Sequence, residues 1–101
     1  MEHFLYRLIP PRPTFPADAT DAENRIMVEH FGYWNGLIAE RKVVAYGPVM
    51  DPRGTYGIAV LEVPDAATAQ VIADGDPAPR ADAGFGFGFE LHPMGDTVVR
   101  T

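Results

Sequence analysis

Two residues of this 101-residue chain, His30 and Asp76, have side chains suited to proton transfer. Histidine changes its charge near neutral pH more easily than other side chains. An aspartate bonded to one ring nitrogen would fix the tautomer and leave the other nitrogen free as a general base or acid. Equally, a lone histidine on an apolar helix face is often a core residue, and Asp-Pro is often a turn. Both interpretations stay open on this evidence.

A long amphipathic helix predicted over residues 21–41 positions His30. Thr20 and Glu23 have the spacing of a capping box, which marks its start. At about 100° per residue, His30 lies at the centre of the apolar side of the helix. The residues within about 80° of it are Glu23, Ile26, Met27, Trp34, Leu37 and Ile38. We therefore expect His30 to face the rest of the protein.

Two glycines weaken the other side of this helix, each by about 1 kcal/mol relative to alanine. Gly32 and Gly36 are four residues apart and so share one side. Either a closely approaching neighbour or simple exposure to solvent would explain them.

The remaining pattern predicts one α+β domain over residues 1–101 with the order βαββαβ. Branched and aromatic runs predict the strands, and Asp65 and Gly75 predict the start and end of a second helix. The predicted strands cover residues 2–9, 42–50, 55–63 and 84–93, with a turn at 51–54 and a loop at 76–83. This order is that of a ferredoxin-like fold, an antiparallel sheet with both helices on one face.

One face of that sheet lacks a helix, yet the third strand is apolar on both sides. Ile58 and Val60 point one way, while Leu61 and Val63 point the other. Soluble monomers avoid a large apolar face in water. We therefore expect a second copy to cover it in a two-fold homodimer.

Four prolines between residues 10 and 16 predict a stiff, extended loop that is ordered because Phe15 needs cover. A domain linker is the competing interpretation. Arg12 in this loop and Arg80 after Asp76 would be contacts for an anionic substrate, although a solvated charge is the ordinary state of an arginine.

The segment Gly84-Phe85-Gly86-Phe87-Gly88-Phe89 alternates with period two, which predicts a strand. A phosphate-binding loop would need a following helix and a lysine or serine, which are missing here. His3, His30 and His92 lack the spacing of a metal site, so we expect no metal.

Composition excludes several classes of function. The net charge of −6 and the pI of about 4.8 argue against nucleic acid or an anionic membrane as partner. The absence of cysteine excludes disulfides and thiol chemistry. The N-terminus lacks a secretory pattern and no run reaches transmembrane length, so we expect a soluble cytoplasmic protein.

Several motifs in a fixed order cover nearly the whole chain. They are His30…Trp34, Val44-Ala45-Tyr46-Gly47-Pro48-Val49, Tyr56-Gly57-Ile58, Asp76-Pro77-Ala78…Arg80-Ala81…Gly84 and Glu90-Leu91-His92-Pro93-Met94. This set resembles the YCII-related (YciI-like) family. The resemblance implies a dimeric α+β barrel and a pocket between the long helix, the loop after the second helix and the sheet. Asp82-Ala83 looks like an insertion relative to the usual spacing.

The resemblance also implies that His30 and Asp76 form the suspected catalytic pair. One branch of the family is similar to a dehydrochlorinase of a chlorinated hydroxyhydroquinone, and distant barrel relatives include muconolactone isomerase. We therefore hypothesise a small cofactor-independent enzyme that eliminates or isomerises a cyclic or aromatic substrate by proton transfer. Trp34, Tyr46 and Pro48 would form its apolar wall. The alternative is a non-catalytic module that binds a small metabolite in the same pocket.

Overall fold

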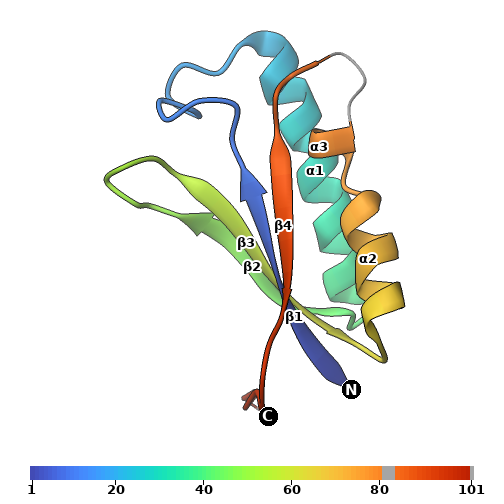
Figure 1. The fold of residues 1–101 in the computed structure, drawn as a ribbon. Helices are drawn as coiled ribbons and strands as arrows, with labels where there is room; N and C mark the ends of the chain where they lie inside the picture. Colours follow the sequence, from blue (N-terminus) through green and yellow to red (C-terminus); the bar gives the residue numbers. More distant parts are fainter. Residues whose placement is uncertain (81–83, 101) are drawn as a thin grey trace.

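The computed structural model describes residues 1–80 and 84–100, and the predicted insertion at Asp82-Ala83 lies outside these residues. Four antiparallel strands form a sheet in the order β2-β3-β1-β4, and the helices pack on one of its faces (Figure 1). The elements are β1 (Glu2–Ile9), α1 (Asp21–Ala39), β2 (Val43–Val49), β3 (Tyr56–Val63), α2 (Ala66–Asp74), α3 (Pro77–Arg80) and β4 (Gly88–Pro93). The predicted ferredoxin-like α+β fold is thus confirmed.

The centre of the sheet is β1, whose alternation separates its two faces. Phe4, Tyr6 and Leu8 are buried under the helices, and Tyr6 lies opposite Ala59 of β3 and Leu91 of β4. The residues between them point to the open face, because successive strand side chains alternate. The core lies between the sheet and α1 and α2.

Capping interactions determine where the two long helices begin. The Thr20 side chain accepts from the Glu23 backbone amide and the Glu23 carboxylate accepts from the Thr20 amide, which confirms the predicted capping box. Asp65 caps α2 with a single interaction of this kind, accepting from the Thr68 amide. α1 ends at Ala39, two residues earlier than predicted, and Arg41 has a φ of 61°, which no helix contains.

Two predictions after α2 were wrong. The predicted loop at 76–83 contains the short helix α3, where Pro77 occupies the first position that proline favours and Asp76 accepts from the Ala78 amide. β4 begins at Gly88 rather than at residue 84. Gly84 and Gly86 have φ angles of 68° and 85°, which only glycine adopts freely, so the Gly-Phe alternation does not produce an extended strand there.

The other face of the sheet carries no helix in the described part of the chain (Figure 1). Its half-buried apolar side chains are Leu5, Ile9, Ile58 and Val60. Arg7 lies among them, with its guanidinium 4.2 Å from the centre of the Tyr56 ring and 3.9 Å from the Glu90 carboxylate. The open face is therefore apolar but crossed by paired charges.

None of the described helices combines the length and the apolar character needed to span a membrane.

Candidate active site

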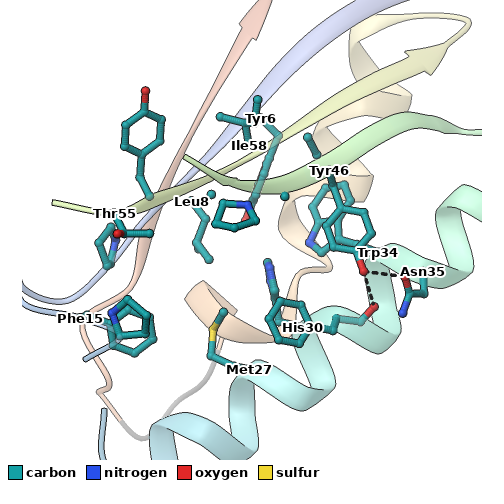
Figure 2. Close-up of a pocket in the computed structure, with 18 of the residues that line it drawn as sticks. Tyr6, Leu8, Phe15, Met27, His30, Trp34, Asn35, Tyr46, Thr55 and Ile58 are labelled. Atoms are coloured by element: carbon teal, nitrogen blue, oxygen red, sulfur yellow. Dashed lines mark hydrogen bonds between the residues drawn. The ribbon is translucent and has the colours of Figure 1, made fainter. Parts of the chain in front are cut away.

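A cavity of about 770 Å³ lies between α1, the sheet and the segment that joins β1 to α1 (Figure 2). Most of its wall is aromatic or aliphatic. The lining residues are Tyr6, Leu8, Pro10, Phe15, Pro16, Asn24, Met27, His30, Phe31, Trp34, Asn35, Tyr46, Gly47, Pro48, Thr55, Tyr56, Gly57, Ile58 and Ala59. Among these, His30 carries an imidazole, a group that can both accept and donate a proton.

Asp76 lies directly behind His30 and is fully buried. Its carboxylate accepts from the Tyr6 hydroxyl at 2.7 Å, from Trp34 Nε1 at 2.8 Å and from the Ala78 amide at 3.0 Å. His30 Nδ1 is 2.9 Å from each carboxylate oxygen. These donors come from β1, α1 and α3, so three elements must be in place before Asp76 is satisfied.

The charge state of Asp76 follows from these contacts. Burial by itself raises the pKa of Asp76, but the hydrogen bond and charge of His30, the Ala78 amide and the Tyr6 hydroxyl outweigh it, and the pKa is lowered. Burial, followed by the nearby Asp76 charge, raises the pKa of Tyr6, so its hydroxyl keeps its proton and donates. Asp76 is therefore an ionised acceptor at neutral pH.

This arrangement determines the tautomer of neutral His30. A carboxylate can only accept, so Nδ1 must carry the proton and Nε2 must hold the lone pair. The side chain of His30 is 8% exposed and lines the cavity (Figure 2). Within residues 1–80 and 84–100, no protein group bonds to Nε2. The free lone pair is thus available to a molecule in the cavity.

The local sequence brings these groups together. His30 and Trp34 are one helical turn apart on α1, so both reach Asp76 from the same side. Gly75 directly precedes Asp76, and a Cβ at this position would collide with the Tyr33 hydroxyl, which bonds to the Ile72 carbonyl at 2.6 Å. Glycine is therefore required where the chain passes Tyr33 before Asp76.

The predicted apolar wall lines the cavity: Trp34, Tyr46 and Pro48 are all among its residues. The two predicted substrate arginines are not. Arg12 bonds Glu23 with two nitrogens at 2.8 Å, and its Nε is 3.0 Å from Asp18. Arg80 is exposed at the end of α3.

Several lining residues were missing from the sequence-based site, among them Tyr6, Leu8, Phe15, Phe31, Asn24, Asn35 and Thr55. On a helical wheel the lining residues of α1 other than His30 lie about 40° to 140° from it, all on one flank. The apolar face of α1 is therefore divided at His30: the side chains on one flank pack in the core, and those on the other line the cavity. Tyr6 could have been found from the pairing of β1 with β3, because it lies opposite Ala59, which also lines the cavity.

The other two histidines lie away from this site. His3 is 2.9 Å from Glu62 and His92 is 3.2 Å from Glu90. Both lie on the open face, because His92 pairs opposite Leu5 and His3 alternates with the buried Phe4. In the described residues, no three histidine or acidic side chains are grouped as a metal site requires.

Residues 4–91 match the family model of the YCII-related domain. The chain belongs to the YCII-related family. Among solved structures, a protein of unknown function from Nitrosomonas europaea, NE2512, has the same fold, with a TM-score of 0.58 and 17% identity over 99% of this chain and 95% of that chain. No curated protein matches.

The geometry of this YCII-related domain allows one chemical event. A molecule in the cavity can give a proton to Nε2 of His30, and the imidazolium that forms lies against the Asp76 carboxylate, which stabilises it. Aromatic rings surround the histidine: Phe31 lies 5.4 Å and Trp34 lies 6.4 Å from it, centre to centre. The two rings pack beside the imidazole in the cavity wall.

Proposed function

We propose that this YCII-related protein is a cofactor-independent acid–base enzyme in which His30 Nε2 takes a proton from a small cyclic substrate. Asp76 positions the imidazole and stays ionised. The observation that supports this most directly is that the carboxylate of Asp76 bonds Nδ1 of His30, while no described residue bonds Nε2 and His30 lines the cavity.

The reaction class that fits such a site is elimination or isomerisation. In either case the C–H bond breaks, its proton moves to Nε2 and its electron pair forms a new double bond. In an elimination the leaving group departs with its own electron pair. In an isomerisation the imidazolium returns the proton to another carbon. One histidine is sufficient for both reactions.

The lining favours an uncharged ring as the substrate. The described residues of the cavity include no lysine or arginine, and the carboxylate of Asp76 behind His30 disfavours an anion. Trp34 and Tyr46 offer aromatic faces for stacking. An ion contact with Arg12 would require its bonds with Glu23 to break. We therefore leave Arg12 and Arg80 out of the proposed binding contacts.

A second function is a non-catalytic module that binds the same ring compound. The support for it is that Asp76 also accepts from Tyr6, Trp34 and Ala78, so the carboxylate has a packing role that needs no catalysis. In that case Nε2 of His30 is only a hydrogen-bond acceptor for the ligand.

Proton exchange into solvent distinguishes the two functions. A panel of unsaturated lactones and halogenated hydroquinones is incubated in D₂O and followed by NMR. We expect the chain to accelerate exchange or turnover of one member, and His30→Gln to lower the rate by roughly 10²- to 10⁴-fold. His92→Gln, on the open face, is the matched control and keeps the rate. Equal rates in a folded His30→Gln protein refute the catalytic role, and binding without exchange favours the module.

We also propose that the chain forms a two-fold homodimer through the open face of the sheet. The half-buried Leu5, Ile58 and Val60 on that face support this, since such a surface is costly in water. Sedimentation at micromolar concentration measures the mass. A mass near 11.0 kDa, that of one chain, refutes the dimer.

A further inference from the structure

The segment between β1 and α1 closes one end of the cavity. Phe15 and Pro16 line the cavity there, and Phe15 is buried with its ring edge-on to Phe87 at 5.2 Å. Figure 2 shows Phe15 at the opposite side of the cavity from Tyr46 and Asn35. Phe15 thus occupies space into which a longer ligand would extend.

A charged anchor holds this segment against the first turn of α1. Nη1 and Nη2 of Arg12 each bond a different oxygen of Glu23 at 2.8 Å, and Nη2 also bonds the Asp18 carbonyl at 2.9 Å. Glu23 is a buried residue, with only 6% of its side chain exposed. Its pKa is lowered to about 2, first by the hydrogen bonds from Arg12 and then by the Thr20 amide. Two-pronged pairs of this kind fix orientation as well as distance.

Two glycines from other parts of the chain hold the same segment from outside. An added Cβ on Gly54 would be 3.4 Å from Pro13 Cα, and one on Gly86 would be 3.3 Å from Pro11 Cβ. Both glycines also have positive φ angles, 147° and 85°. Close packing on two sides and the restricted φ of the prolines make the segment a fixed wall.

We propose that Phe15 determines the length of ligand that the cavity accepts, and that Arg12 is a positioning residue that acts through Phe15. This rests on ligand binding in the cavity as proposed above, but not on catalysis. Each of the three guanidinium nitrogens of Arg12 already bonds Glu23 or Asp18, so Arg12 contributes to the geometry of the cavity rather than placing a charge in it.

The chain supplies its own probe, because its single tryptophan, Trp34, lies in the cavity wall. Fluorescence titration with phenol and with 4-phenylphenol compares two uncharged ligands that differ in length by one ring. In Phe15→Ala we expect the affinity ratio to shift toward 4-phenylphenol by at least about tenfold, since the second ring is buried where the benzyl group was.

Variants of the anchor separate positioning from general structure. Arg12→Gln should shift the ratio the same way but less, and Arg12→Lys should lie between Arg12→Gln and the parent, because lysine keeps the charge but not the two-pronged bond. Phe15→Leu keeps an apolar side chain and should shift the ratio less than Phe15→Ala. Arg53→Gln is the matched control, since Arg53 pairs with Asp51 two residues away, and it should leave the ratio unchanged.

The outcomes separate this proposal from the preceding one. If Phe15→Ala binds both phenols with the parent ratio, the length-setting role is overturned. If neither phenol binds the parent chain, ligand binding as proposed above fails, and the wall is judged by acrylamide quenching of Trp34. Stronger quenching in Phe15→Ala and Arg12→Gln than in Arg53→Gln supports the wall, and equal quenching overturns it.

Discussion

Two carboxylates are buried beside the cavity, Glu23 at the start of α1 and Asp76 after α2. Each accepts several hydrogen bonds and each has a lowered pKa. They differ in their partner. Glu23 faces the guanidinium of Arg12, which is permanently charged and cannot accept a proton, whereas Asp76 faces an imidazole with a second nitrogen. The Arg12–Glu23 pair can therefore only fix the position of the two segments, while the His30–Asp76 pair contains a group that can exchange a proton.

The two pairs also differ in how far apart their members lie in the chain. Arg12 and Glu23 are 11 residues apart and join a loop to the helix that follows it. His30 and Asp76 are 46 residues apart and meet only when both helices pack on the same face of the sheet. The Arg12–Glu23 pair is therefore nearly local, and the His30–Asp76 pair depends on the whole fold.

The largest effect should come from Asp76→Asn. The amide of asparagine cannot accept at its nitrogen, so some donors among Tyr6, Trp34, His30 and Ala78 lose their partner. We expect a loss of about 3–5 kcal/mol in the free energy of unfolding in urea. The surface variant Asp74→Asn is the control and should change stability by less than about 0.5 kcal/mol. A similar small change in Asp76→Asn would contradict the central role of this carboxylate.

Gly75→Ala should perturb the Asp76 pair and leave the Glu23 pair intact. The new methyl group meets the Tyr33 hydroxyl, so the backbone next to Asp76 has to shift. Such overpacking costs about 1–3 kcal/mol. Urea unfolding measures this, and the indole N–H resonance of the single Trp34, bonded to Asp76, should move. An unchanged resonance would show that Asp76 has not shifted.

Acid should weaken both pairs with the same sign. Each folded carboxyl has a lower pKa than its unfolded form, so between the two values the unfolded chain binds more protons and acid favours unfolding. The contribution of Glu23 to the free energy of unfolding is fully present above pH 4.5 and is lost as the pH falls toward about 2. The Asp76 contribution is lost below about 4, by up to about 1.4 kcal/mol per pH unit. Urea unfolding from pH 6 to pH 2 measures the slope.

Both Asp76→Asn and Glu23→Gln should make this acid slope shallower than in the parent chain. Asp74→Asn is the matched control, because Asp74 is exposed to water, and this variant should retain the parent slope. A parent slope retained by Asp76→Asn would refute its share of the acid sensitivity.

The smallest effect should come from Gly32→Ala, which touches neither pair. Nothing lies within 4 Å of a Cβ added to Gly32 or Gly36, so solvent exposure, one of the two predicted explanations, accounts for them. Alanine should raise the free energy of unfolding by up to about 1 kcal/mol through helix propensity. Thermal unfolding with Gly36→Ala as a duplicate measures it. A loss of stability would reveal a neighbour on this side of the helix in solution.

Local sequence signals predicted the helices and strands well where the capping residues and the hydrophobic periodicity indicated the same element. The capping box at Thr20 and Glu23, the cap at Asp65 and the stop at Gly75 act within a few residues, so they can be recognised without the fold. The segment at residues 84–87 was misjudged because the Gly-Phe alternation has strand period while its glycines adopt backbone that a strand excludes. The helix α3 was missed because it is only 4 residues long and depends on the Asp76 side chain.

By itself, the sequence determined the order of elements, the start of each long helix and the position of His30 on the apolar side of α1, because these depend on period and on capping. Only the tertiary structure decided that Asp76 bonds Nδ1 of His30, that Tyr6 and Trp34 share the same carboxylate, and that Arg12 pairs with Glu23. The physical reason is that hydrogen bonds between distant segments depend on how helices and sheet pack, which no local pattern encodes.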